Sequence, residues 1–341
     1  MNHWSFYPTT YRQAEVQRIV AAAQRGACTA VIGLSGSGKS NLLGFLVRRV
    51  AVAGLEWKWL DGNRLRQRNA DGFWQLIGEA LGCGAELMEI ERALAQRLEN
   101  PQQHVCLVMD RFDALPEMEA EVVAGNLRAL RDTFKYQLSY VIGMRHPPAP
   151  NSELAELFLA NTLWLGPLSH ADGVWSVAEF ARRAGLDWPA EVQERIYALS
   201  GGYASFLRAT CEAFAADGVL EEEALRAHPA VRARLEEFWS DAPGAEALRL
   251  CGLENHAWLS GRGEELTALE HRLLTALQAR VGEVCQKDDL IRAVWSEDRV
   301  FERGVRDDSL AQLVRRLRQK IGEDAIQTLP GRGYRLISKK G

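Results

Sequence analysis

One stretch of the chain combines residue types and spacing that suit chemistry on phosphates. It carries glycine, four residues, glycine, lysine and serine, which is the spacing of a phosphate-binding loop. In such a loop the backbone N–H groups surround the phosphates, the lysine reaches the β- and γ-phosphates, and the serine hydroxyl binds Mg²⁺. We therefore predict a site for a nucleoside triphosphate and Mg²⁺. Its expected contacts are Gly33, Ser35, Gly36, Ser37, Gly38, Lys39, Ser40 and Asn41, with the Ser40 hydroxyl on the metal.

The segments on both sides of this loop have the patterns that would hold it in place. Residues 29–32 are short, apolar and rich in β-branched side chains, which predicts a strand. Residues 41–47 carry apolar side chains at helical spacing. The alternative is a glycine-rich turn followed by Lys and Ser by chance, and it leaves both flanks unexplained.

A second chemical element follows residues 104–110, an apolar segment that predicts a buried strand ending in Asp110. This has the form of a Walker B element, in which the carboxylate holds the Mg²⁺ shell through water. Asp113 is the candidate for orienting an attacking water, and Arg111 and Phe112 displace it from the usual adjacent position. The alternative for both acids is that they cap the turn or helix after the strand.

A third candidate, Arg145, ends a predicted strand at residues 138–144. In proteins with an extra strand between the two nucleotide-binding strands, the residue at its tip faces the γ-phosphate. A cation there would report the nucleotide state or stabilise the developing charge. The alternative is a solvated arginine at a strand end. The catalytic candidates are therefore Asp113, Asp110 and Arg145.

The elements around these residues alternate between strands and helices, which predicts an α/β fold with a parallel sheet. From residue 169 to about residue 250 the chain reads as helices, with one break at residues 199–203. We expect a P-loop core over residues 1–168 and a helical lid or adapter over residues 169–253. Further helices are expected within 11–25, 73–77, 90–98 and 122–130, and further strands at 56–61 and 162–165.

The order of these motifs carries a family resemblance. After the loop come Asp110-Arg111-Phe112-Asp113-Ala114-Leu115, Gly143-Met144-Arg145, Gly166-Pro167-Leu168-Ser169 and Ser200-Gly201-Gly202-Tyr203. Over about residues 10–240 this order resembles the signal-transduction P-loop ATPases, the STAND group of the AAA+-like class.

The resemblance to STAND ATPases implies several properties. It implies a core sheet in the order 5-1-4-3-2, a helical domain that closes over the nucleotide, and Arg145 as a sensor. ATP or ADP as the ligand also rests on it, since no guanine-specific NKxD motif is present. The family has an adenine-contacting segment near Tyr11 and Arg12. One departure is Ala204, where many members have a proline that contacts the nucleotide.

Composition and charge bound the remaining possibilities. The 341 residues exceed one typical core, and 47% hydrophobic and 25% charged residues are typical of a globular protein. The six cysteines show no CxxC pair and no histidine at metal-ligand spacing, so we expect reduced thiols and no zinc. The start has no basic segment leading into an apolar one, and no run is long enough to cross a bilayer. We therefore expect a cytoplasmic protein with no membrane partner.

The net charge of −4 is unevenly distributed. Residues 303–341 hold ten Lys or Arg against four Asp or Glu, a charge of +6, so residues 1–302 carry −10. This asymmetry predicts a nucleic-acid contact at the C-terminus.

The most basic helix of this region is predicted over about residues 308–321, after earlier helices from Thr267 and over 287–295. Its apolar stripe faces the core, and the opposite surface would suit the major groove. The alternative is a basic face that is only solvated. Asp308, Gln312, Arg315, Arg316 and Gln319 lie on the outward surface, and Arg318 and Lys320 lie on its flanks, where they suit phosphates.

Residues 326–336 predict two short strands joined at a glycine-bracketed Arg332. Such a hairpin would project Arg332 into a minor groove, with Arg335 near the DNA backbone. Residues 254–338 resemble the winged helix-turn-helix domain of OmpR-like response regulators, through LTALEHRLL, LIRAVW, LVRRLRQKI and IQTLPGRGYRLI. The resemblance implies double-stranded DNA binding by a domain over residues 254–341, which a short hairpin at 256–262 would open. The acidic pair Asp307-Asp308 departs from it and would repel phosphate.

These features predict an ATP-dependent transcription regulator, in which the nucleotide state changes the lid and hence the presentation or oligomerisation of the winged helix. Slow hydrolysis would suffice for such a switch. An alternative is a DNA-loading or remodelling ATPase of the origin-recognition or transposition type, because such proteins also join an ATPase to a winged helix. A third possibility is a sensor that a regulatory protein or foreign nucleic acid releases from a nucleotide-locked state.

Overall fold

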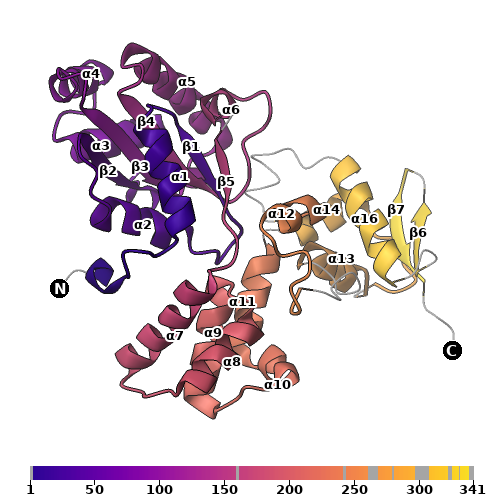
Figure 1. Ribbon diagram of the computed structural model, residues 1–341. Helices are drawn as coiled ribbons and strands as arrows, with labels where there is room; N and C mark the ends of the chain where they lie inside the picture. Colours follow the sequence, from indigo (N-terminus) through magenta and orange to yellow (C-terminus); the bar gives the residue numbers. More distant parts are fainter. Residues whose placement is uncertain are drawn as a thin grey trace. The chain divides into compact units, whose positions relative to one another are not determined.

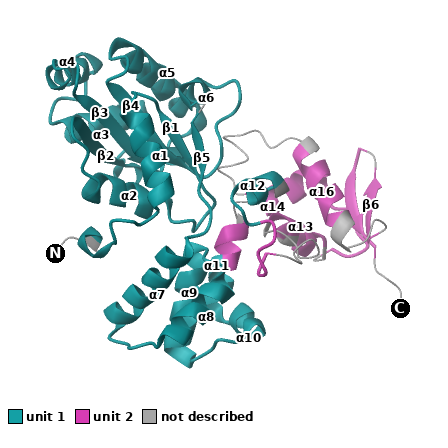
Figure 2. Cartoon of the chain, in the orientation of Figure 1, with its two compact units in different colours: residues 1–234, 244–253 teal, residues 235–243, 254–341 magenta. Residues whose placement is uncertain are grey.

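The computed structural model divides the chain into two compact units (Figures 1 and 2). Unit 1 comprises residues 1–234 and 244–253, and unit 2 comprises residues 235–243 and 254–341. Each unit is described by itself below. The structure describes residues 3–158, 161–240, 243–259, 268–278, 280–295, 307–321, 325–329 and 331–337.

Unit 1 contains one parallel sheet in the order β2-β3-β4-β1-β5. This is the predicted order 5-1-4-3-2, read from the opposite edge, so the prediction is confirmed. The inner strands β1, β3 and β4 are largely apolar and buried because helices cover both faces of the sheet, whereas the edge strand β2 alternates apolar and charged residues. The strands are β1 (Thr29–Ile32), β2 (Leu55–Asp61), β3 (His104–Asp110), β4 (Leu138–Met144) and β5 (Thr162–Trp164).

The two faces of the sheet bury different sets of side chains, because successive residues of a strand point to opposite faces. Cys106 and Val108 of β3 pack with α1 (Gln13–Ala23) and α2 (Lys39–Arg49). Leu107 and Met109 pack on the other face. The helices of that face are α3 (Ala70–Leu81), α4 (Leu87–Arg97), α5 (Glu117–Thr133) and α6 (Glu153–Phe158).

Three short 3₁₀ helices complete the core. The segment η1 (His3–Phe6) precedes α1, while η2 (Gly62–Arg64) and η3 (Phe112–Ala114) follow directly on β2 and β3. Since β2 and β3 are parallel neighbours, η2 and η3 emerge at the same edge of the sheet as the phosphate-binding loop.

The rest of unit 1 is helical, as the pattern predicted. Ser169 caps the first of these helices by accepting a hydrogen bond from the Asp172 N–H, and Gly201 ends the second with a φ of 56°. The break expected at residues 199–203 is therefore present. The helices are α7 (His170–Ala184), α8 (Ala190–Ser200), α9 (Ala204–Asp217), α10 (Glu222–Ala227), α11 (Pro229–Ser240) and α12 (Ala245–Leu250), of which α11 continues into unit 2.

Unit 2 contains helices and a two-stranded antiparallel hairpin. Gly333 starts the second strand with a φ of 139°, and a Cβ there would lie 2.0 Å from the Cys285 carbonyl, so this position requires glycine. The sequence predicted a short hairpin at residues 256–262. The part of it that the structure describes, residues 256–259, forms turns, and Thr267 lies outside the described residues. The elements are α13 (Ala268–Gln278), α14 (Lys287–Val294), α16 (Asp307–Ile321), β6 (Ile326–Leu329) and β7 (Gly333–Leu336).

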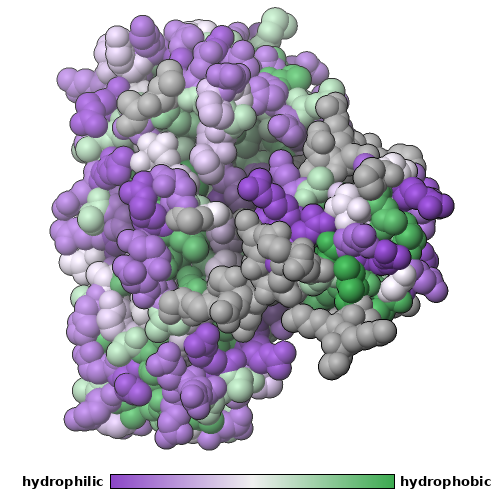
Figure 3. All heavy atoms as spheres, turned by 90° about the vertical axis from the view of Figure 1, so that its right-hand side faces the viewer, coloured by the Kyte–Doolittle hydropathy of each residue, from purple (hydrophilic) through white to green (hydrophobic). Residues whose placement is uncertain are grey.

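Hydrophilic side chains predominate on the face drawn in Figure 3, and hydrophobic ones are exposed in smaller patches. Among the described residues, no helix has the length and apolar character needed to cross a bilayer. All six cysteines have free thiols, as expected, and five of them are buried.

Candidate nucleotide and DNA sites

The phosphate-binding loop lies between β1 and α2, where the flanking patterns placed it. Gly36 and Gly38 have φ values of 79° and 89°, which side chains other than glycine adopt only with strain. Gly38 is the N-cap of α2, so the helix begins at Lys39 and directs its free N–H groups into the loop. A concave set of N–H groups at a helix N-terminus is suited to an anion.

The side chains of the loop fit phosphate groups. The Lys39 ammonium donates to the Gly33 carbonyl and, at 3.3 Å, to that of Leu34, so it lies over the loop. The Ser37 hydroxyl is buried, with 1% of the residue exposed, and has no hydrogen-bond partner among the described residues. A buried hydroxyl without a partner is costly, and this one lies beside the Gly33 backbone at the base of the loop.

The predicted metal residues Asp110 and Ser40 lie together. The Ser40 hydroxyl bonds to the Asp110 carboxylate, and Gly143 of β4 leaves room for that carboxylate, because a Cβ there would lie 3.3 Å from its Oδ1. Burial raises the pKa of Asp110, and the hydrogen bond from Ser40 opposes this. Among the described residues, no group of three or more His, Cys, Asp or Glu side chains is arranged to hold a metal ion.

The other two catalytic candidates form an ion pair. The Arg145 Nε lies 3.5 Å from the Asp113 Oδ2, and both side chains are about one-third exposed, at 35% and 33%. Asp113 reaches this position because Arg111 has a left-handed backbone with a φ of 57°, which turns the chain into η3. The arrangement pairs the predicted γ-phosphate sensor with a carboxylate.

Three consecutive loop carbonyls are held by groups outside the loop. The Tyr203 hydroxyl donates to the Ser35 carbonyl at 2.6 Å, and the Ser205 N–H donates to that of Gly36 at 3.0 Å. The Arg12 guanidinium donates to the Ser37 carbonyl at 3.1 Å. Because a trans peptide is planar, an outward carbonyl turns the next N–H to the opposite side. The Ser35 and Ser37 contacts therefore direct the N–H groups of the two following glycines toward the phosphate side, while the Ser37 N–H closes a turn on the Leu34 carbonyl.

Arg12 joins the loop to the junction between core and lid. It is 2% exposed with a φ of 46°, and its guanidinium also bonds to the Gly166 carbonyl at 3.0 Å and to Glu15 at 2.8 Å. Its backbone N–H donates to the Asp172 carboxylate of α7 at 3.1 Å. The family resemblance implies an adenine-contacting segment near Tyr11 and Arg12, and in the structure the Arg12 side chain contacts the loop backbone. The sequence did not reveal the roles of Tyr203, Ser205 and Asp172.

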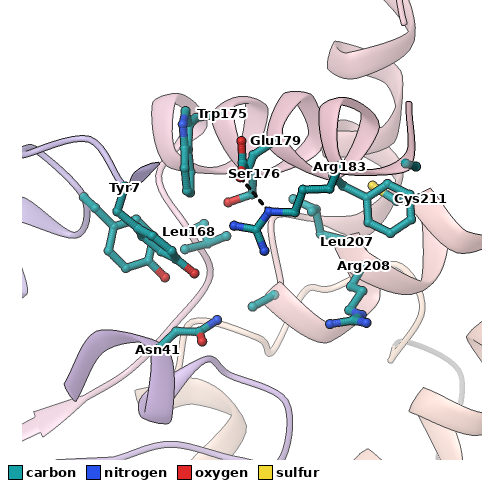
Figure 4. A pocket seen from close by; sticks show the side chains of 14 residues that line it. Tyr7, Asn41, Leu168, Trp175, Ser176, Glu179, Arg183, Leu207, Arg208 and Cys211 are labelled. Carbon is teal, nitrogen blue, oxygen red and sulfur yellow. Dashed lines mark hydrogen bonds and ion pairs between the residues drawn. The ribbon is translucent and has the colours of Figure 1, made fainter. Parts of the chain in front are cut away.

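A cavity of about 400 Å³ lies between the start of α2 and the lid helices α7 and α9 (Figure 4). Tyr7, Tyr11 and Trp175 supply aromatic walls, and Asn41, the last of the predicted loop contacts, lies at its edge. Burial raises the pKa of Tyr7 to about 12, so this phenol stays neutral. A cavity of this size with aromatic walls beside a phosphate site suits a nucleoside base.

An ion pair with a half-exposed arginine also lines this cavity. The Arg183 Nε lies 2.6 Å from the Glu179 Oε1, and both side chains come from α7. Hydrogen bonds from Arg182 and Arg183 lower the pKa of Glu179 to about 2. The carboxylate is therefore charged at neutral pH and fixes the Arg183 side chain at the cavity.

The predicted recognition surface lies on α16 of unit 2. Its apolar stripe, Leu310, Leu313, Val314 and Leu317, is buried as predicted. Gln312, Arg315 and Arg316 are exposed on the other side, whereas the side chains of Asp308, Gln319 and Lys320 lie outside the described residues.

The arginines near the hairpin differ in their freedom to contact DNA. Arg318 donates to the Ile326 carbonyl at 2.7 Å and to the Thr328 hydroxyl at 2.6 Å, so it ties α16 to β6. Arg335 donates to the side chain of Gln327, its cross-strand neighbour. Arg332 is exposed at the hairpin turn.

The parallel sheet and the phosphate-binding loop of unit 1 define a P-loop ATPase. The helices and the two-stranded hairpin of unit 2 define an OmpR-like winged helix. The chain belongs to the family described as Novel STAND NTPase 1, whose model matches residues 10–237. The model "Transcriptional regulatory protein, C terminal" matches residues 261–336. Both resemblances predicted from the sequence are thereby confirmed.

Individual proteins are similar to part of the chain in sequence or to the chain in fold. The chain is 39% identical over 77 residues to the transcriptional regulatory protein CseB of Streptomyces coelicolor, which covers 23% of this chain and 31% of that protein. The Walker-type ATPase PABY2304 of Pyrococcus abyssi has a similar fold, with a TM-score of 0.50 and 14% identity over 95% of this chain and 92% of that one. Cdc6p of Pyrobaculum aerophilum matches with a TM-score of 0.45 and 14% identity, over 97% and 92%.

Proposed function

We propose that the protein is a cytoplasmic, ATP-dependent transcription regulator in which the nucleotide at the phosphate-binding loop controls the winged helix on double-stranded DNA. One observation carries the proposal: lid residues hold the loop that would bind the phosphates. Tyr203 and Ser205 reach the loop from the start of α9, so filling the loop and positioning the lid are linked steps.

The nucleotide would occupy the loop and the adjoining cavity. Lys39 would contact the β- and γ-phosphates, Ser40 and Asp110 would hold Mg²⁺, and the base would enter the cavity beside Asn41. Mg²⁺ would supply charge neutralisation between the phosphates.

The pair of Arg145 and Asp113 would distinguish ATP from ADP. A γ-phosphate carries more negative charge than one carboxylate, so it would compete with Asp113 for the guanidinium. The released Asp113 would then be available to orient water for slow hydrolysis, and ADP would restore the ion pair. The lid would pass this change to unit 2, by presenting the winged helix, by forming oligomers, or by binding a regulatory protein.

On DNA, α16 would lie in the major groove, with Gln312 and Arg315 toward the bases and Arg316 toward phosphate. Arg332 would reach the minor groove from the hairpin turn. Arg318, Lys320 and Arg335 remain proposed phosphate contacts, and for Arg318 this requires its hydrogen bonds to β6 to be shared with the DNA.

The test is footprinting of the full chain on genomic DNA without nucleotide, with ADP and with a non-hydrolysable ATP analogue. We expect protection that depends on the nucleotide and is lost in Lys39→Ala, while Lys135→Ala serves as an exposed control. Protection that is identical in all three states, and in Lys39→Ala, would refute nucleotide control. Hydrolysis that depends on DNA length, without any change in transcription, would favour a DNA-loading ATPase instead.

A separate variant tests the winged helix. Arg315→Ala combined with Arg332→Ala should weaken duplex binding at least about tenfold, since each good base contact contributes ~1–3 kcal/mol. Arg25→Ala in unit 1 is the matched control. Unchanged binding by the double variant would refute the DNA surface without bearing on the nucleotide site.

A further inference from the structure

Asp61, at the end of β2, lies beside Asp110 of the predicted metal site. The strands β2 and β3 pair in register up to their last residues, which places Asp61 directly opposite Asp110. Neighbouring strands are ~4.8 Å apart, and residues paired in a parallel sheet point to the same face. Trp57 and Trp59 of β2 pack on the face that α2 covers, and the period of two places Asp61 on that face as well.

The backbone after each acid keeps the two carboxylates together. Gly62 is pressed against the turn that follows Asp110, because a Cβ at this glycine would lie 2.9 Å from the Asp110 carbonyl and 2.4 Å from that of Arg111. No larger residue would allow this approach. The position of Asp61 is therefore fixed by the same packing that forms η2 and η3.

The Asp61 carboxylate is oriented by its own turn. Its Oδ1 accepts hydrogen bonds from the Asn63 N–H at 3.0 Å and from the Asn63 side-chain amide at 2.9 Å. Both of these bonds go to one oxygen. Their geometry holds the carboxylate rigidly, which suits a group that positions water around an ion.

Two carboxylates at this distance favour a cation. The register places both acids at the carboxyl ends of neighbouring strands and on one face of the sheet, where their like charges repel. A hydrated divalent ion would relieve this repulsion.

We propose that Asp61 is the second carboxylate of the Mg²⁺ site, where it holds a water of the ion's shell alongside Asp110. Mg²⁺ keeps several of its waters and is usually bound through one or two carboxylates together with substrate phosphates. The proposal rests on the proposed nucleotide function and adds a metal-positioning residue from outside the loop and the Walker B strand.

A simpler role for Asp61 is to cap η2 through Asn63. The variant Asp61→Asn separates the two roles, because an amide oxygen can still accept both hydrogen bonds but the negative charge is lost. Asp132→Asn makes the same change at an exposed carboxylate of α5, whose side chain is 58% exposed, and serves as the matched control.

The experiment titrates Mg²⁺ into the full chain and measures binding of a fluorescent, non-hydrolysable ATP analogue. We expect Asp61→Asn to raise the Mg²⁺ concentration at half-maximal binding about tenfold, the usual effect of losing an outer-shell group. Binding of ADP in the presence of EDTA should match the wild type. Asp132→Asn should behave as the wild type in both measurements.

Two results overturn the proposal. An unchanged Mg²⁺ midpoint in Asp61→Asn shows that its charge does not act on the ion, and an equal loss of ADP binding in EDTA shows a structural role. If the wild type binds no nucleotide, or Lys39→Ala binds it equally well, the proposed function itself fails. If nucleotide binding by the wild type depends on Lys39 and the Mg²⁺ midpoint of Asp61→Asn equals that of the wild type, this inference is refuted and the proposed function is not.

Discussion

The contact between Tyr203 and the loop can be removed with the loss of one oxygen atom. Tyr203 is fully buried, and its hydroxyl donates to the carbonyl of Ser35, which is 6% exposed. Tyr203→Phe keeps the ring and its packing. The variant therefore tests whether the lid organises the loop for phosphate, without disturbing the lid itself.

The expected magnitude follows from this single hydrogen bond. A buried hydrogen bond contributes a net ~0.5–1.5 kcal/mol, and a carbonyl left without a donor can cost ~1–3 kcal/mol. Since ~1.4 kcal/mol is a factor of ten in affinity, we expect ADP and the ATP analogue to bind about 3- to 10-fold more weakly. The loss arises because the peptide after Ser35 becomes free to rotate, which turns the Gly36 N–H away from the phosphates.

Isothermal titration calorimetry on the full chain measures this change. Tyr140→Phe is the matched control, because its buried hydroxyl also donates to a backbone carbonyl, that of Leu127, at 2.8 Å, but within the core. Nucleotide affinity in Tyr203→Phe that equals or exceeds that of the wild type would refute the reasoning. An equal loss in Tyr140→Phe would show that general destabilisation, and not the loop contact, is responsible.

Three further predictions concern other parts of the chain. Gly333→Ala should unfold the hairpin of unit 2 and abolish DNA binding, because its Cβ would lie 2.0 Å from the Cys285 carbonyl. Circular dichroism and a DNA-binding assay check this, and a stable variant that still binds DNA would contradict it. Arg318→Ala should lower the thermal stability of unit 2, because it removes the hydrogen bonds to Ile326 and Thr328. An unchanged melting temperature together with weaker, less salt-dependent DNA binding would instead show a phosphate contact. Glu179→Gln should lower the melting temperature at pH 7. The difference from the wild type should shrink as the pH falls from about 4.5 toward about 2, because a carboxylate with a lowered pKa contributes stability above its unfolded pKa and loses it on protonation. A difference in melting temperature that does not vary with pH would contradict this.

Local patterns predicted the core well because its strands are buried on both faces. The bounds of β3 and β4 follow from uninterrupted apolar runs, and the position of the loop follows from its flanks. The stripe of α16 was also correct, since helical periodicity fixes which side chains face inward.

Contacts between distant residues could not be predicted in the same way. Tyr203 and Ser35 are 168 positions apart, and periodicity carries no information about such a pair. A helical wheel gives the direction of Arg318 but not the carbonyl that it meets on β6. Asp61 had a local signal, an acid at the end of a strand, but its register with Asp110 emerges only from the assembled sheet.

The hydrogen bonds to the loop carbonyls also set an order of events during synthesis. When the first 168 residues have left the ribosome, all five strands are available, and so are Lys39, Ser40 and Asp110. The donors to the Ser35 and Gly36 carbonyls are still missing, because Tyr203 and Ser205 follow later in the chain. The nascent protein therefore gains its finished phosphate cradle only after the start of α9 has emerged, well after the loop itself has been made.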